Sequence, residues 1–331
     1  MKKINLGIIG TGLAARHLHY PALQKLSDKF EIALVCNHTE PKVKSFSKLT
    51  GGTPYTLNYM DVLNSPDIDA VSIALPIELN YKVAKDAMKA GKHVILEKPL
   101  AANLAEASSL VKLASGYKKV FMVAENFRYR KVFQSAKAHV KKEDIGKVYS
   151  FIWNSLANVD VNNNMWAQTK WRQKHKYAGG FITDGGVHFA AALRLLVGDI
   201  SEGSVFAGSV NKRIGEQDTF SLQFTTKSGV NGLLNLYYSV KGYYEDKLLI
   251  LGTKGAIEIS NNMLKLNVEG KKERIETWEE DNGYYEEFLD FYNAIVKKSK
   301  TASPAKEAYK DLEIMLRGLQ AGEQGKRFKI N

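Results

Sequence analysis

Asp184 and His188 have the residue types and the spacing for proton transfer. They stand four residues apart, so a helix over residues 182–197 would place both side chains on one face. A histidine can accept or donate a proton near neutral pH, and a neighbouring carboxylate fixes its tautomer. Each residue also has a structural interpretation, Asp184 as a helix cap and His188 as a core histidine whose hydrogen bonds are satisfied.

Lys98 directly follows Val94–Leu96, a short apolar segment that has the composition of a buried strand. A lysine at the carboxyl end of a parallel strand points into the crevice where ligands bind in such sheets. There it could orient a substrate hydroxyl or help to move its proton. The alternative is an exposed lysine in a turn.

A polar loop with two tryptophans precedes the segment that carries Asp184. Trp166, Trp171 and Arg172 could line or cover a pocket. Arg172 could bind an anionic or polyhydroxylated substrate, and a tryptophan can stack on a sugar ring. The alternative is a surface loop with Trp171 packed against its domain.

The turn after the first apolar run has the pattern of a dinucleotide-binding site. Gly10 would allow a tight turn, Gly12 would let backbone N–H groups approach a pyrophosphate, and Ala15 would keep the next helix close to the sheet. The phosphate would lie at a helix N-terminus, where free N–H groups and the helix dipole favour an anion. The alternative is a structural glycine-rich turn. The candidate phosphate-binding residues are Gly10, Thr11, Gly12, Leu13 and Ala14.

The end of the second predicted strand indicates which cofactor would bind. NAD sites carry an acidic residue there, which binds the ribose 2′-hydroxyl. This sequence has Asn37, His38 and Thr39 in the turn and no carboxylate that would repel a 2′-phosphate. Arg16 or Lys42 could add positive charge. We therefore predict NADP rather than NAD; the alternative is an NAD site that uses water or backbone contacts.

Strand-like and helix-like segments alternate over the first 124 residues. This spacing predicts a parallel, doubly wound Rossmann sheet with right-handed crossovers. The predicted strands are Ile4–Ile9, Glu31–Cys36, Ala70–Leu75, Val94–Leu96 and Val120–Ala124, and the predicted helices are Leu13–Lys25, Thr39–Leu49, Glu78–Ala90 and Asn103–Ser115.

After about residue 122 the pattern changes to successive strands with short turns, which predicts a large, mainly antiparallel sheet flanked by helices. We therefore predict two domains, a dinucleotide-binding Rossmann domain at 1–122 and an α+β domain for substrate binding and oligomerisation at 123–331. The predicted strands are Val148–Asn154, Gly203–Val210, Thr219–Thr225, Val230–Tyr238, Lys247–Leu251, Ala256–Ser260 and Met263–Val268, and the helices Val132–Lys141, Ile182–Val197, Tyr284–Lys297 and Pro304–Leu319. Candidates for a subunit interface on the outer face are Leu233, Leu234, Leu236, Tyr237 and Tyr238.

Composition limits the function classes. The chain has 331 residues, 44% of them hydrophobic and 25% charged, which is ordinary for a globular protein. Its one cysteine, Cys36, makes no internal disulfide, so we expect the cytoplasm. No apolar run approaches the ~20 residues of a membrane span, and Gly10 and Gly12 interrupt the first run, so we expect no targeting segment. The net charge of +12 is scattered, which favours a small anionic ligand over nucleic acid.

Four motifs in order resemble the glucose–fructose oxidoreductase, inositol dehydrogenase and MocA (Gfo/Idh/MocA) family, over essentially the whole chain. They are the Gly10-to-Ala15 turn, Ala90-Gly91-Lys92-His93-Val94 running into Glu97-Lys98-Pro99, Glu125-Asn126-Phe127-Arg128-Tyr129, and Gly179 to His188. A narrower resemblance, carried by the segment from Thr169 to Lys174, is to fungal NADP(H)-linked oxidoreductases.

The resemblance implies hydride transfer between nicotinamide and a carbinol or carbonyl carbon of a sugar, polyol or small carbonyl compound. Lys98 would position and polarise the oxygen, His188 would exchange the proton, and Asp184 would hold His188 or a substrate hydroxyl. The resemblance also implies dimers or tetramers through the sheet of the second domain. Beyond the glycine turn, the candidate cofactor residues are Asn37, His38, Leu75, Pro76, Asn80, Glu97, Lys98 and Asn126, and the candidate substrate residues are Arg128, Trp171 and Arg172.

Two departures from the family pattern prevent the transfer of a particular sugar substrate. Asn80 stands where many members have a histidine, and Ala191 where many have a second aspartate. The rival interpretation is a non-catalytic NADP-binding regulator or redox sensor; a third is an enzyme that holds and recycles its cofactor. A zinc site at His175, Asp184 and His188 is a further alternative, but hydride transfer needs no metal and we predict none.

Overall fold

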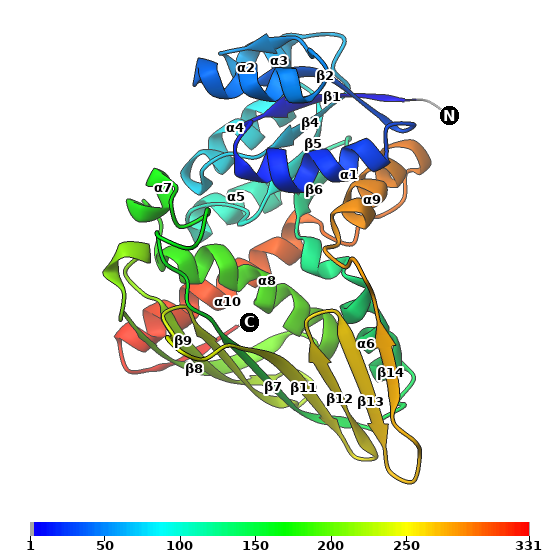
Figure 1. Ribbon diagram of the computed structural model, residues 1–331, viewed down its shortest axis with the longest axis vertical. Helices are drawn as coiled ribbons and strands as arrows, with labels where there is room; N and C mark the ends of the chain where they lie inside the picture. Colours follow the sequence, from blue (N-terminus) through cyan, green and yellow to red (C-terminus); the bar gives the residue numbers. More distant parts are fainter. Residues whose placement is uncertain (1–2, 331) are drawn as a thin grey trace. The chain divides into compact units, whose positions relative to one another are not determined.

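The computed structural model describes residues 3–330 and divides the chain into two compact units (Figure 1). The first unit comprises the chain up to Asn126 together with Gly283–Tyr309. The second comprises Phe127–Asn282 and the chain from Lys310 on. The sequence prediction placed everything after residue 122 in one domain, so the return of Gly283–Tyr309 to the first unit differs from that prediction.

The first unit is built on a six-stranded parallel sheet in the order β3-β2-β1-β4-β5-β6. Every residue of β4 and β6 is buried, as expected for strands covered on both faces. The Rossmann prediction is therefore confirmed. The strands are β1 (Ile4–Ile9), β2 (Phe30–Cys36), β3 (Tyr55–Thr56), β4 (Ala70–Ile73), β5 (His93–Glu97) and β6 (Phe121–Ala124).

The helices of the first unit follow the predicted positions, with two differences. The predicted helix Leu13–Lys25 begins with a π-helical turn, η1 (Ala15–His19), before α1 (Tyr20–Lys25). The sequence reading also missed β3 and α3, which have two and six residues and too few positions for a period. The remaining helices are α2 (Glu40–Leu49), α3 (Tyr59–Asn64), α4 (Ile77–Lys89), α5 (Leu104–Ser115) and α9 (Tyr284–Lys297).

α9 belongs to the first unit because its aromatic face packs there. Phe291 stacks on Phe30 of β2 with ring centroids 6.4 Å apart, and Phe288 and Tyr292 meet the same ring edge-on. All three α9 rings are buried. The sequence pattern identifies the apolar face of this helix correctly, but periodicity does not say which sheet that face covers.

The second unit is built on a nine-stranded sheet in the order β14-β13-β12-β11-β7-β10-β9-β8-β15. Adjacent strands in this sheet run antiparallel, except β7 and β10, which run parallel. The mainly antiparallel sheet is therefore confirmed, and the short edge strands β14 and β15 are additions to it. The strands are β7 (Val148–Leu156), β8 (Ile200–Gly208), β9 (Thr219–Thr226), β10 (Asn231–Tyr237), β11 (Glu245–Gly252), β12 (Gly255–Ser260), β13 (Met263–Val268), β14 (Arg274–Thr277) and β15 (Arg327–Lys329).

Helices cover one face of this sheet. Figure 1 shows α6, α8 and α10 on the same side of it. α8 is long and apolar enough to span a membrane by length and composition, but 72% of it is buried, as in the core helix of a folded domain. The helices are α6 (Lys131–Lys141), α7 (Lys170–Gln173), α8 (Gly180–Val197) and α10 (Ala305–Glu323), and the boundary between the two units falls within α10.

The pleat of β10 corrects the predicted interface residues. Successive side chains of a strand point to opposite faces, so Leu234 and Leu236 lie in the core and are fully buried. Tyr238, just past the strand, is buried too. Leu233 and Tyr237 remain as candidates for the outer face, and Leu233 is 40% exposed.

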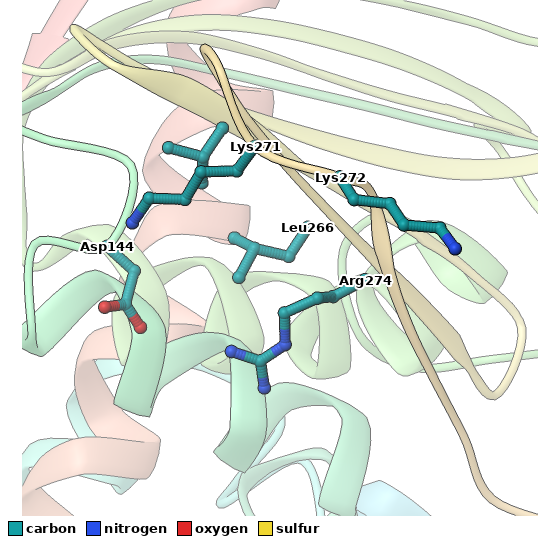
Figure 2. A pocket seen from close by; sticks show the side chains of 6 residues that line it. Asp144, Leu266, Lys271, Lys272 and Arg274 are labelled. Carbon is teal, nitrogen blue, oxygen red and sulfur yellow. The ribbon is translucent and has the colours of Figure 1, made fainter.

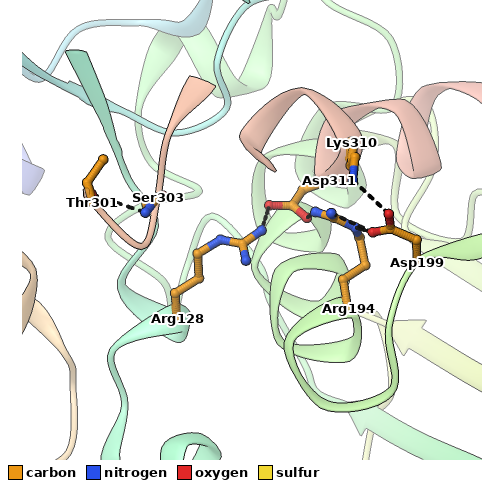
Figure 3. Close-up of polar contacts among 7 residues, drawn as sticks. All are labelled: Arg128, Arg194, Asp199, Thr301, Ser303, Lys310 and Asp311. Carbon is orange, nitrogen blue, oxygen red and sulfur yellow. Dashed lines mark hydrogen bonds and ion pairs between the residues drawn. The ribbon is translucent and has the colours of Figure 1, made fainter. Parts of the chain in front are cut away.

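A network of buried charges ties the second unit together (Figure 3). The Asp311 carboxylate accepts hydrogen bonds from Arg128 at 2.6 Å and from Arg194. Arg194 also donates to Asp199, which pairs with Lys310 at 2.7 Å. Both ends of the Arg128–Asp311 pair are at most 5% exposed. Arg128, a predicted substrate residue, is therefore committed to an internal ion pair.

Replacing Asp311 by Asn is expected to cost about 3–5 kcal/mol of unfolding free energy, because two buried guanidinium groups lose their shared counter-charge. Denaturant unfolding of parent and variant measures this loss. Lys310→Met, which removes the partly exposed end of the same network, is the control and should cost no more than ~1 kcal/mol. Equal losses in the two variants would contradict the account.

Candidate functional site

The glycine turn after β1 has the geometry for binding a dinucleotide. Gly10 has a φ of 97°, and a Cβ there would lie 2.2 Å from the carbonyl oxygen of Ala74, so only glycine fits. A Cβ at Gly12 would meet nothing within 4 Å, which leaves open space beside the turn. Thr11 Oγ1 is buried and has no hydrogen-bond partner among residues 3–330. A pyrophosphate against this turn would supply the missing acceptor.

The end of β2 brings together polar groups that the sequence indicated and one that it did not. Asn37 Oδ1 accepts a hydrogen bond from the backbone N–H of Thr39 at 2.9 Å and so shapes the start of α2, while His38 is exposed. Arg16 Nη2 donates to Ser45 Oγ at 3.0 Å, and its guanidinium lies over the Phe46 ring. Arg16 thus links the glycine turn to α2. Ser45 was missed because a serine inside a helix carries no pattern.

Lys98 follows β5, at the same carboxyl edge of the sheet as the glycine turn. The Asn80 amide donates to the carbonyl oxygens of Glu97, at 3.0 Å, and Pro99, at 2.8 Å. These two residues flank Lys98, so Asn80 holds the backbone on both sides of it. Asn80 is fully buried, and its Oδ1 has no hydrogen-bond partner in the part of the chain that the structure describes. Asn80 is predicted to contact the cofactor, and in the structure its amide nitrogen holds the backbone around Lys98.

The other predicted cofactor residues of the first unit lie around the same edge. Leu75 is next to the glycine turn, because its Cδ2 would be 3.0 Å from a Cβ at Gly10. Pro76 caps α4, and Asn126 lies at the end of the unit and is buried.

In the second unit, Asp184 and His188 lie one turn apart on α8, as predicted. Asp184 Oδ2 accepts a hydrogen bond from Arg172 Nε at 2.6 Å, and this ion pair is almost completely buried. The His188 ring stacks on Phe127, with centroids 4.8 Å apart and planes 22° from parallel. The ring of His188 is thus oriented by an aromatic face, and the carboxylate of Asp184 by a guanidinium.

The predicted cluster of Trp166, Trp171 and Arg172 exists. The Arg172 guanidinium lies 4.0 Å from the Trp171 ring centroid and 5.3 Å from that of Trp166. Its Nη1 also donates to Thr169 Oγ1. Cation–π contacts of this kind are strongest where water is excluded. The cluster therefore ties the segment around α7 to α8 through Arg172 and Asp184.

Tyr238, which the sequence analysis placed at a subunit interface, lies in this region, and its place beside α8 was not predicted. A Cβ on Gly185 would lie 2.8 Å from the Tyr238 hydroxyl oxygen, so the glycine lets that hydroxyl lie against α8 beside Asp184. Burial raises the pKa of Tyr238, and the carboxylates of Asp184 and Asp246 raise it further. The hydroxyl therefore keeps its proton and can donate it. The alternation of buried residues along β10, at 234 and 236, continues to residue 238 just past the strand and could have identified Tyr238 from the sequence.

Both halves of the chain match one family of known proteins. The model of the oxidoreductase family with the NAD-binding Rossmann fold matches residues 4–125, and that of its C-terminal alpha/beta domain matches residues 137–330. The chain belongs to the Gfo/Idh/MocA family. This confirms the family resemblance.

The similar proteins include fungal and bacterial members of the Gfo/Idh/MocA family. The chain is 33% identical to the Saccharomyces cerevisiae protein YMR315W, with 91% of this chain and 90% of that protein covered. It is 26% identical to the dehydrogenase FPY6 of Fusarium mangiferae, with 94% of each covered. An oxidoreductase of Thermotoga maritima has a solved structure with a TM-score of 0.93 and 36% identity, covering 99% and 98% of the two chains. The two fungal relatives agree with the narrower fungal resemblance.

The three residues of the zinc alternative have other neighbours in the structure, Arg172 for Asp184, Phe127 for His188 and Tyr177 for His175. His175 stands against Tyr177, with ring centroids 5.2 Å apart, and its Nδ1 lies 3.3 Å from the Arg172 carbonyl oxygen. Over residues 3–330, no three His, Cys, Asp or Glu side chains gather in a way that could hold a metal ion.

A small pocket of the second unit lies apart from the predicted site residues (Figure 2). In Figure 2 the side chains of Asp144, Lys271 and Arg274 point toward a common space, while Lys272 points away from it. Asp144 already pairs with His139 at 2.6 Å. None of the residues predicted to bind cofactor or substrate lines the pocket, so it is not the candidate site. Its lining is Asp144, Leu266, Val268, Lys271, Lys272 and Arg274.

A buried acid lies close to the Glu-Lys-Pro motif in the first unit. Glu287 of α9 is fully buried, and neither of its carboxyl oxygens has a hydrogen-bond partner among residues 3–330. Burial raises its pKa well above the usual 4.5, and the negative charges of Glu97, Glu125 and Asp290 raise it further. Glu287 is therefore held in its neutral form.

Glu287→Gln keeps the shape of the side chain and removes the carboxyl group that takes up and releases a proton. The raised pKa means that the folded state holds a proton that the unfolded chain releases near pH 4.5, so the parent loses stability as the pH rises above that value. The variant is expected to have a higher Tm than the parent at pH 7, with the gap closing toward pH 4. Melting curves across this range measure it. Glu286→Gln, on the same helix turn, is the control, and a gap that does not change with pH would contradict the prediction.

Proposed function

We propose that the chain is an NADP(H)-dependent oxidoreductase that interconverts a carbinol and a carbonyl group in a sugar, a polyol or a small carbonyl compound. Membership of the Gfo/Idh/MocA family makes the chain an oxidoreductase of NAD-binding type. One observation carries the proposal further: Lys98 and the glycine turn occupy the same carboxyl edge of one parallel sheet. That edge is where α/β sheets bind ligands.

The residues of the chain take distinct roles in this reaction. A bound nicotinamide cofactor supplies the hydride donor or acceptor. Lys98 places a positive charge against the substrate oxygen and stabilises the alkoxide charge that develops there. His188 exchanges the hydroxyl proton through an imidazole nitrogen. The guanidinium of Arg172, 2.6 Å from Asp184, favours the charged carboxylate, so Asp184 acts as an acceptor for a substrate hydroxyl.

The substrate class rests on the fold neighbours. Levoglucosan dehydrogenase, in complex with NADH and levoglucosan, has a TM-score of 0.89 at 21% identity. WlbA of Bordetella pertussis, in complex with NADH and UDP-GlcNAcA, has a TM-score of 0.89 at 20% identity. Both ligands are sugars or sugar derivatives. The presence of Lys98, Asp184 and His188 favours an enzyme over a non-catalytic regulator, which has no need of all three.

NADP is our choice of cofactor because of the groups at the end of β2. Arg16 is positioned by Ser45, and the turn of Asn37 and His38 contains no carboxylate. A guanidinium at this place can form charge-assisted hydrogen bonds with a 2′-phosphate. Among the neighbours, NADH and NAD+ are named for several and NADPH for one.

We also propose that two or four copies of the chain associate through the outer face of the nine-stranded sheet. Leu233 of β10 and Leu249 of β11 both pair in register with Ile152 of β7, so the three side chains form an apolar row across neighbouring strands. Leu233 is 40% exposed. An exposed apolar row on a sheet face is typical of an association surface.

Catalysis is tested by turnover of NADPH with a panel of aldoses, ketoses and small carbonyl compounds. Lys98→Met and His188→Asn are each expected to lower kcat by about 100-fold or more while the protein still binds the cofactor. His175→Gln, a histidine given no role in the reaction, is the control. Cofactor binding without turnover of any compound would favour the regulator.

The cofactor choice is tested by thermal unfolding with NADP, NADPH, NAD and NADH at matched concentrations, since a ligand of the folded state raises the Tm. The phosphorylated pair is expected to give the larger rise. Arg16→Ala should weaken NADPH binding about 10-fold and leave NADH binding almost unchanged. A rise with NAD and NADH alone would overturn the choice.

Leu233→Lys is expected to shift the protein to a smaller assembly, because a charge at the exposed end of the apolar row must be desolvated on association. Light scattering coupled to size-exclusion chromatography measures the mass. Tyr55→Lys, at an exposed aromatic residue of the first unit, serves as the control. An unchanged mass for Leu233→Lys would show that the outer face is not the interface.

A further inference from the structure

A chain of buried polar side chains in the first unit ends at Lys98. His19 is fully buried; its Nδ1 lies 3.0 Å from Ser72 Oγ and its Nε2 2.7 Å from Glu97 Oε1. The second oxygen of the same carboxylate, Glu97 Oε2, accepts the backbone N–H of Lys98 at 3.1 Å. The Glu97 carboxylate therefore connects the imidazole of His19 directly to the main chain of Lys98.

Burying these polar groups lowers the stability of the fold, which indicates a role beyond filling the core. A buried imidazole and a buried carboxylate destabilise a fold unless hydrogen bonds replace the lost water, and apolar residues of similar size pack there at a lower cost. Hydrogen bonds of His19 and Glu97 connect Ser72 in β4 to the strand end at Lys98 without a break. Their contacts hold one specific stretch of backbone.

The position of His19 depends on the π-helical turn that follows the glycine turn. A π turn inserts one residue into a helix and rotates the side chains after it, and such turns often occur at functional sites. His19 is the last residue of that turn. On its other side the ring meets Phe288 of α9 edge-on at 5.1 Å, which closes the cluster against water.

Glu287 lies close enough to Glu97 for the two carboxyl groups to interact, and burial raises the pKa of Glu287. The raised pKa favours the neutral form of Glu287, so this acid adds no further negative charge beside Glu97. Asn80 completes the arrangement by holding the carbonyl groups before and after Lys98. The Lys98 backbone is therefore held at its own N–H and at both neighbouring residues.

We propose that His19 is a positioning residue for Lys98, acting through Glu97 to fix the direction in which the lysine side chain leaves the end of β5. The role rests on the proposed function, in which Lys98 meets the substrate oxygen. His19 itself does not touch the substrate. In this role, the buried His19 and Glu97 of the Glu-Lys-Pro motif act together to orient Lys98.

The test reads Lys98 directly and needs no substrate. The folded protein is treated with limiting acetic anhydride, and mass spectrometry gives the rate of acetylation of Lys98 relative to exposed lysines such as Lys42. His19→Leu and Glu97→Met are each expected to change this ratio by about threefold or more, because the side chain then samples other directions. His19→Gln, which keeps hydrogen-bonding atoms, should restore most of the parent ratio.

Two further variants keep the test decisive. His17→Gln, an exposed histidine two residues earlier, is the matched control and should leave the ratio unchanged. Ser72→Ala removes only the outer hydrogen bond of His19, so it should shift the ratio in the same direction by less, and it decides the matter if His19→Leu does not fold. A parent-like ratio in folded His19→Leu or, failing that, in Ser72→Ala and Glu97→Met together would overturn the proposal.

Turnover separates this inference from the proposed function. With any substrate that the panel yields, His19→Leu is expected to lower kcat about 10-fold or more and to change the KM for cofactor little, since a displaced catalytic group costs rate more than binding. Absence of turnover in the parent would count against the proposed function and leave the labelling result intact. Normal turnover together with a parent-like labelling ratio would overturn the positioning role alone.

Discussion

The hydrogen bonds from Asn80 to the carbonyl groups of Glu97 and Pro99 fix the strand end on which the proposed chemistry depends. Inside a parallel sheet the neighbouring strands bind the N–H and C=O groups of each residue, but at the last residue of a strand this ladder stops. A side chain must then take over. Asn80 does so from α4, and Glu97 does so from the strand itself, so that Lys98 emerges from a backbone held on both sides.

In the second unit, guanidinium groups hold two of the buried carboxylates. Asp184 lies against Arg172, and Asp311 lies between Arg128 and Arg194. The ion pair of Asp184 differs from the others because two tryptophan rings, Trp166 and Trp171, pack on its guanidinium. The Arg172 side chain therefore holds the Asp184 carboxylate on α8 and the tryptophan rings around α7 at the same time. This links the position of Asp184 to the conformation of the neighbouring loop.

Local chemistry made much of the fold and of the candidate site predictable. The glycine turn, the buried parallel strands and the helix carrying Asp184 and His188 all follow from residue types at short spacing. The sequence could not show contacts between distant residues. The motifs that predict a cofactor role for Asn80 and a substrate role for Arg128 give no sign of their partners within the protein, the carbonyl groups beside Lys98 and the carboxylate of Asp311, because packing sets these contacts. For the same reason, the sequence did not show that α9 packs against the sheet of the first unit.

The return of Gly283–Tyr309 to the first unit has a consequence for how the protein is made. A ribosome completes the six strands of the first unit well before it makes α9, and until then Phe30 lacks the aromatic rings that cover it and His19 lacks the wall of Phe288. Domains whose chain is continuous can fold as they emerge. Here the Rossmann unit must wait until strands β7 to β14 of the other sheet have been made, so a chain interrupted before α9 leaves Phe30 without its aromatic cover.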